Sequence, residues 1–171
     1  MPLTILNRQR AFKISKKAAQ PLFDAMLDAA GIAEREITLV FTSDRGIREL
    51  NRTYRHVNEA TDCLSFVAGE GEDGQLAGPV LGDIVISLQS ALAQGREYAP
   101  EDVSDEEVLL SEVVLLFTHS LMHLLGHDHD TPAKEKKMKA AEQELLTTVG
   151  LIGDDACSDH DCHTCGHGCC D

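Results

Sequence analysis

The segment THSLMHLLGHDHD, residues 118–130, contains four histidines in a largely apolar stretch. On a helix, four residues turn the chain by about 400°, so His119 and His123 lie one above the other on the same face. Gly126 is expected to end such a helix and let the chain fold back. His129, three residues later, can then reach the same point. The spacing predicts that these three imidazoles bind one metal ion.

Three neutral imidazoles with an open fourth position are typical of catalytic zinc, which acidifies a water molecule. The spacing H-x-x-x-H-x-x-G-x-x-H is also that of the metzincin zinc peptidases. Those enzymes place a glutamate after the first histidine as general base, whereas this chain has Ser120. A serine does not take a proton from water at neutral pH, so the usual peptidase route is disfavoured. His127 would need a tighter turn to reach the ion, and Asp128 is a candidate acceptor that orients a ligand histidine.

The alternative interpretation treats the histidines as polar side chains at a helix end, each hydrogen-bonded separately. That interpretation requires neither the glycine nor a third histidine at this spacing. We therefore favour the metal site.

Hydrophobic periodicity predicts the elements that position these residues. Strands are expected over 3–6, 36–42, 63–67 and 83–87, and helices over 16–30, after Ser43 and over 88–98. The mixture of strands and helices lacks regular alternation, which favours an α+β fold. We expect a single domain with a four-stranded, mostly parallel or mixed sheet packed on helices, and a flexible loop over 69–79.

The histidines belong to a helix that begins at a capping box, Ser104 with Glu107. It is apolar nearly all round, so it should be the buried central helix of the domain, ending at Gly126. A last helix is expected from Thr131-Pro132 to about Val149, amphipathic and facing solvent.

Composition limits the class of protein. The chain has 171 residues, 43% hydrophobic and 26% charged, as in globular proteins. No apolar run is expected to reach the length of a membrane span, and residues 1–10 lack the order of a signal peptide, so a cytoplasmic protein without a membrane partner is expected. Residues 1–56 carry a charge of +4 and the remainder −18, giving −14 overall. This balance argues against broad, non-specific nucleic-acid binding but leaves room for a local basic groove.

Three blocks of the sequence together resemble the YbeY family of bacterial endoribonucleases that mature ribosomal RNA. They are HSLMHLLGHDH, LNRTYRHVNEATDCLSF (50–66) and LGDIVIS (81–87). The chain departs from the family pattern at several positions: Ser120 replaces glycine, Met122 leucine, Asn58 aspartate, Ala60 proline and Cys63 valine.

The resemblance implies that His119, His123 and His129 bind one Zn²⁺ and that Arg55 is the functional arginine facing the metal cleft. A planar guanidinium suits the charge that develops on phosphoryl oxygens, and a peptidase would not need it. The implied activity is zinc-dependent cleavage of single-stranded RNA in 16S 3′-end maturation and ribosome quality control. The implied partners are ribosomal RNA, the small ribosomal subunit and its proteins, or an assembly GTPase.

The composition changes after Gly153, so the metal-dependent hydrolase domain is assigned to 1–152 and a separate acidic tail to 153–171. The tail has enough soft ligands for one tetrahedral ion, an additional Zn²⁺, although incidental metal binding by a disordered tail stays open. Its candidate ligands are Cys157, Cys162, Cys165, Cys169, Cys170, His160, His163 and His167.

Two other functions remain as alternatives. A zinc metallopeptidase would share the ligand spacing, and the absence of glutamate at position 120 counts against it. A non-enzymatic metal-handling protein would explain the tail but has no use for Arg55 or for an open coordination position.

Overall fold

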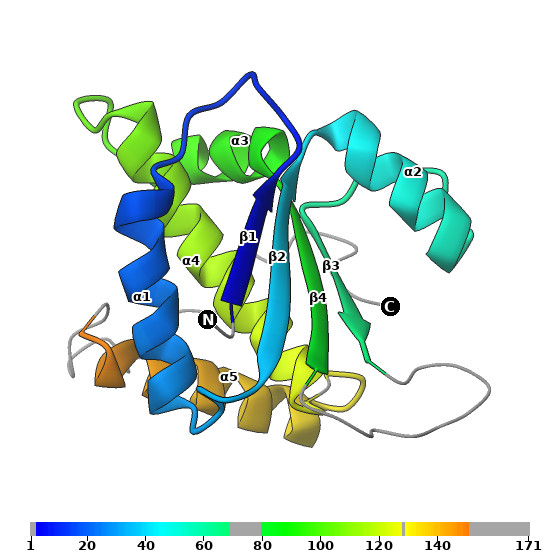
Figure 1. Cartoon of the computed structure of the whole chain (residues 1–171), viewed down its shortest axis with the longest axis vertical. Helices are drawn as coiled ribbons and strands as arrows, with labels where there is room; N and C mark the ends of the chain where they lie inside the picture. Colours follow the sequence, from blue (N-terminus) through cyan, green and yellow to red (C-terminus); the bar gives the residue numbers. More distant parts are fainter. Residues whose placement is uncertain (1–2, 69–79, 128, 151–171) are drawn as a thin grey trace.

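The computed structural model describes residues 3–68, 80–127 and 129–150. Their elements follow the irregular order expected of an α+β domain (Figure 1). In chain order they are β1 (Leu3–Asn7), α1 (Lys16–Ala29), β2 (Glu36–Thr42), α2 (Asp44–Arg55), β3 (Cys63–Val67), β4 (Val80–Ser87), α3 (Leu88–Tyr98), α4 (Asp105–Leu124) and α5 (Pro132–Thr148). The expected loop over 69–79 and the tail over 153–171 lie outside the described residues, so the boundary after residue 152 stays a prediction.

Each of these helices begins at a serine or threonine whose side chain accepts a backbone N–H of the first turn. Such an N-cap satisfies a donor that has no partner inside the helix. The capping residues are Ser15, Ser43, Ser87, Ser104 and Thr131.

The four strands form one mixed sheet in the order β1-β2-β4-β3, which confirms the expected architecture. β1, β2 and β4 run parallel, and β3 pairs antiparallel with β4 at the edge. β4 begins three residues earlier than the sequence pattern predicts. Gly82 interrupts the pattern there: its φ is +155°, and a Cβ would lie 2.2 Å from the carbonyl oxygen of Phe66.

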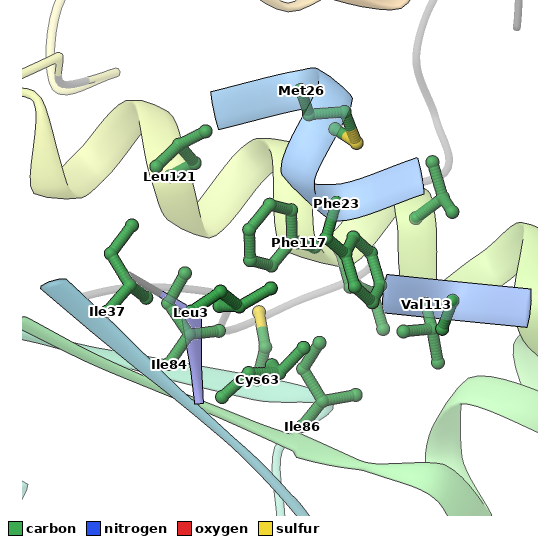
Figure 2. Packing of buried hydrophobic residues seen from close by; sticks show 14 of the residues in the cluster. Leu3, Phe23, Met26, Ile37, Cys63, Ile84, Ile86, Val113, Phe117 and Leu121 are labelled. Atoms are coloured by element: carbon green, nitrogen blue, oxygen red, sulfur yellow. The ribbon is translucent and has the colours of Figure 1, made fainter. Parts of the chain in front are cut away.

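The main core fills the space between one face of the sheet and helices α1 and α4. Phe23 of α1 and Phe117 of α4 lie with ring centroids 4.5 Å apart. Figure 2 shows these rings opposite strand residues such as Ile84 and Cys63. Cys63 is fully buried, as expected of a small hydrophobe in a strand.

Helix α4 is the buried central helix that the sequence predicts. Its 20 residues are long and apolar enough to cross a membrane by length and composition, which the sequence pattern had not led us to expect. Of the apolar window, 61% is buried inside the protein. Core helices meet the same criterion, and the burial of residues such as Val113 and Leu121 accounts for the composition.

On the opposite side of the sheet lies α2 (Figure 1). Ile47 of α2 packs in a small apolar cluster with Leu64 of β3 and Val85 of β4. The helix covers only part of this face, because Leu6 at the β1 end is 37% exposed.

The expectation that α5 faces solvent was wrong for one side of the helix. Met138, Leu145 and Leu146 are buried in the main core. Positions 138, 142 and 145 lie on one helical face, so the burial of Met138 and Leu145 also turns Glu142 inward.

Candidate metal centre

The last turns of α4 place two imidazoles on one face of the helix. The Nε2 atoms of His119 and His123 are 3.3 Å apart, and the ring centroids are 4.8 Å apart. This pairing is what the four-residue spacing on a helix predicts.

The turn after α4 brings in a third imidazole. Gly126 has φ +92°, and its N–H bonds to the His123 carbonyl while the His127 N–H bonds to that of Met122. These two bonds form a Schellman motif, which reverses the chain at a helix end. The ring of His129 then lies 5.3 Å from that of His123 and 6.1 Å from that of His119, centroid to centroid.

The three histidines form a donor set that fits a metal ion. One ligand nitrogen from each of His119, His123 and His129 lies within 4.8 Å of the others, and each residue is partly buried. Zinc–nitrogen bonds of 2.0–2.1 Å in a tetrahedral site put two ligand nitrogens roughly 3.3 Å apart. The distance between His119 and His123 matches that separation. His127 is not part of the group, and Asp128 lies outside the described residues.

Glu142 of α5 fixes the orientation of His119. Its Oε1 lies 2.8 Å from Nδ1 of His119, which leaves Nε2 facing the other two rings. The side chains are only 14% and 23% exposed. A carboxylate on the far nitrogen of a ligand histidine fixes its tautomer and makes the ligand more basic. Sequence reasoning missed this residue, although its spacing from Met138 and Leu145 was a usable signal.

The pKa of His119 is raised above its ordinary value. Burial lowers it, but the hydrogen bond and charge of Glu142, with smaller effects from Cys63 and Asp62, together outweigh that penalty. In the metal-free protein the imidazole therefore holds a proton more firmly than an isolated histidine. A metal ion has to displace that proton in order to bind.

Ser120 points away from the imidazoles and into the core. Its side chain is fully buried, and its Oγ has no hydrogen-bond partner within the described part of the chain. Its backbone carbonyl lies 3.5 Å from Oγ of Ser65 in β3. This contact joins the metal-site helix to the edge strand.

Arg55, the last residue of α2, reaches the same edge strand from the other face of the sheet. Its Nη2 donates to the carbonyl oxygen of Ser65 at 2.8 Å, and its Cζ lies 5.6 Å from the ring centroid of Phe66. A guanidinium has five N–H donors. Within the described residues Ser65 is its hydrogen-bond acceptor, and the remaining donors are available to a ligand.

The loop between α2 and β3 is held by side chains despite its departures from the family pattern. Asn51, which is buried, donates to the carbonyl oxygen of Glu59 at 2.9 Å. Asn58 accepts from Nε of Arg48 at 3.0 Å. His56 ends α2 in the left-handed region, with φ +60°. These bonds position Arg55 against β3.

Comparisons with known proteins identify relatives along most of the chain. Proteins named Endoribonuclease YbeY match from Myxococcus xanthus (42% identical over 75% of this chain and 40% of that protein), Heliobacterium modesticaldum (36%, over 86% and 83%) and Clostridioides difficile (36%, over 88% and 98%). A solution structure of a Thermotoga maritima protein, TM1509, matches with a TM-score of 0.48 and 21% identity over 85% of this chain and 89% of that one. The model of the family Endoribonuclease YbeY matches residues 4–150. The chain therefore belongs to the YbeY endoribonuclease family.

Proposed function

We propose that this protein is a zinc-dependent endoribonuclease that cuts single-stranded RNA. The observation that carries the proposal is the convergence of His119, His123 and His129 in a chain of the YbeY family. We further propose that it acts in maturation of the 16S ribosomal RNA 3′ end and in ribosome quality control, as the family resemblance implies.

The three histidines would hold the ion, and Glu142 would keep His119 in the tautomer that presents Nε2. The ion would supply a Lewis acid that acidifies water near neutral pH. His119 is followed in the chain by Ser120, whose backbone carbonyl accepts from Oγ of Ser65. The backbone carbonyl of Ser65 in turn accepts from Nη2 of Arg55. These contacts link Arg55 through β3 to the helix that carries the histidines, and they support a role for it in the same reaction.

The role proposed for Arg55 is electrostatic. Cleavage of a phosphodiester increases the negative charge on the phosphoryl oxygens, and a fixed guanidinium can bind two of them at once. The bond to Ser65 holds the guanidinium in place before the substrate arrives. Such an arrangement stabilises charge without a rearrangement during the reaction.

A peptidase activity is less well supported. The usual zincin mechanism requires a carboxylate directly after the first histidine ligand. Here that position is Ser120, whose hydroxyl is buried in the core. A serine hydroxyl does not take a proton from water at neutral pH, so it would not replace that carboxylate as the general base.

The direct test incubates the zinc-loaded protein with a structured 3′ fragment of ribosomal RNA and, separately, with casein, each with and without chelator. We expect RNA cleavage that the chelator abolishes and no casein cleavage. Casein cleavage would instead support the metallopeptidase, and no cleavage of either would favour a metal-handling protein.

Variants separate the two parts of the site. His123→Ala should abolish cleavage by removing a ligand. Arg55→Ala should lower kcat by about 10²- to 10³-fold, as for the loss of one charge-stabilising donor, with the zinc content unchanged. Arg10→Ala, an exposed arginine after β1, is the control. Parent-like cleavage by Arg55→Ala would remove the arginine from the mechanism.

The proposed partners are ribosomal RNA and, in the cytoplasm, the small ribosomal subunit with its proteins or an assembly GTPase. The names of the relatives support RNA as the substrate. The net charge of −14 supports a protein partner, because an acidic protein attracts bare RNA poorly.

A further inference from the structure

An open groove lies on the sheet face that α2 covers only in part. It is a hollow of about 540 Å³, within the range of small-molecule sites. Its floor is two cross-strand rows on one face of the sheet, one running from Thr38 through Asp83 to Phe66 and the other containing Val40 and Val85. The lining residues are Leu6, Arg8, Thr38, Val40, Leu50, Tyr54, Phe66, Val67, Asp83 and Val85.

An aromatic pair stands at the α2 end of this groove. Tyr54 is 62% exposed, although it is a large ring, and it meets Phe66 edge-on with centroids 5.4 Å apart. The ring faces of an exposed tyrosine above an apolar floor are what unstacked nucleobases bind in single-stranded RNA.

The groove adjoins the proposed phosphate site through two of its lining residues, Tyr54 and Phe66. Tyr54 directly precedes Arg55, and the Arg55 guanidinium lies 5.6 Å from the ring centroid of Phe66. The Phe66 ring therefore contacts both the Tyr54 ring and the Arg55 guanidinium. A nucleotide with its phosphate at Arg55 would have its base directed toward this pair.

The charges favour a base rather than a phosphate inside the groove. Asp83, exposed on the floor beside Phe66, repels phosphate but accepts hydrogen bonds from base N–H groups. Arg8, exposed at the β1 end, offers a cation to a neighbouring phosphate outside the floor. Arg8 and Arg55 lie toward opposite ends of a floor that is mostly apolar apart from Thr38 and Asp83, which matches the alternation of phosphates and bases in a single strand.

We infer that this groove is a nucleobase-binding subsite, in which Tyr54 and Phe66 stack an unpaired base of the RNA strand whose phosphate is held at Arg55. The inference rests on the proposed endoribonuclease function and deepens it. It assigns the selection of single strands to this groove, because a base held in a duplex is not free to stack on Tyr54.

Tyrosine fluorescence gives a direct test, because the chain contains two tyrosines and no tryptophan. In a Tyr98→Phe protein the remaining tyrosine is Tyr54. Titration with a short single-stranded oligoribonucleotide should quench its emission, whereas an abasic strand of the same length should not. Equal quenching by the abasic strand would show phosphate contacts alone and overturn the inference.

Kinetics provide a second readout. Tyr54→Ala should raise KM for RNA cleavage roughly 5- to 150-fold with kcat retained, as expected for loss of one stacked base. Tyr54→Phe should behave like the parent, because the ring supplies the contact. Tyr98→Ala, which alters a tyrosine 66% exposed at the end of α3, is the matched control.

The outcomes distinguish the groove from the proposed function. If the parent cleaves RNA, and Tyr54→Ala cleaves with an unchanged KM, the base subsite is wrong and the endoribonuclease stands. If RNA binds without quenching the Tyr54 emission, the base does not occupy this groove, and the inference is wrong. If the parent neither binds nor cleaves RNA, both proposals fall together.

Discussion

At the scale of single residues, the proposed metal centre includes a carboxylate outside the three-histidine group. Glu142 holds Nδ1 of His119 at 2.8 Å and so directs Nε2 toward His123 and His129. It also raises the basicity of the ring against the opposing effect of burial. A neutral side chain at this position would keep the shape and lose the charge.

Glu142→Gln should therefore weaken zinc binding by about 10- to 100-fold, the usual cost of removing such a partner. Competition with a chromophoric chelator at pH 7.5 measures this affinity. The matched control is Glu144→Gln, which alters an exposed carboxylate on the same helix. Equal zinc affinity in the two variants would mean that Glu142 plays no part in holding the ion.

At the scale of elements, the turn after α4 decides whether two or three imidazoles meet. Gly126 and Gly150 both have positive φ, +92° and +77°, and a Cβ would meet nothing within 4 Å at either position. Alanine at these positions therefore costs backbone strain without a clash. The two glycines differ in their place along the chain: Gly126 leads to His129, whereas Gly150 lies just after the end of α5.

We expect Gly126→Ala and Gly150→Ala each to lower the free energy of unfolding by about 1 kcal/mol. Only Gly126→Ala should also weaken zinc binding, because it displaces the turn that carries His129. Urea unfolding of the metal-free proteins and chelator competition separate the two effects. A parent-like zinc affinity in Gly126→Ala would show that the turn tolerates another path to the ion.

Helix α4 also carries a carboxylate whose burial costs stability. Burial, and then the charge of Asp62, raises the pKa of Glu112. The folded state therefore keeps the proton on Glu112 to higher pH than the unfolded chain does. The protonated carboxyl favours the folded state at acid pH, and this contribution to stability is lost as pH rises through the pKa of the folded state.

Glu112→Gln should accordingly raise the melting temperature of the metal-free protein at pH 7. Its advantage should shrink as pH falls below the ordinary glutamate pKa. Calorimetry at several pH values would follow this difference, with exposed Glu101→Gln as the control. A variant less stable than the parent at pH 7 would contradict the unfavourable effect of the carboxylate.

Most elements could be predicted from local sequence, because periodicity and capping act over a few residues. The strand over residues 36–42, the helix over 88–98 and the turn at Gly126 needed no tertiary information. The inner face of α5 was missed because its apolar residues are sparse among lysines and glutamates. The groove beneath Tyr54 was missed because it depends on pairing between strands distant in the chain.

At the scale of the whole molecule, charge limits how the protein can find RNA. The overall charge is −14, and the arginines on the outer side of α2 do not form a net basic track. The hollow of about 820 Å³ there is lined by equal numbers of arginines and carboxylates. Its charged residues are Arg45, Arg48, Arg52, Asp44, Glu49 and Glu59.

The protein should therefore bind naked RNA weakly, because few phosphate contacts oppose the overall repulsion. Salt screens those contacts, so binding should weaken further as salt is added. Fluorescence anisotropy with a labelled single strand between about 50 and 200 mM salt measures this dependence. Addition of small ribosomal subunits should increase cleavage of the same RNA sequence when it is presented on the subunit. Tight binding to naked RNA that is insensitive to salt would remove the need for a protein partner.

The tail over 153–171 holds five of the six cysteines in the chain. We predict that it binds one zinc ion independently of the three histidines. Removal of residues 153–171 should then lower the zinc content by one equivalent per chain, with RNA cleavage retained. Metal analysis of the truncated and full-length proteins, beside His123→Ala in the full-length chain, assigns each equivalent. An unchanged zinc content after truncation would rule out the tail site, whereas loss of cleavage as well would indicate that the tail delivers metal to the histidines.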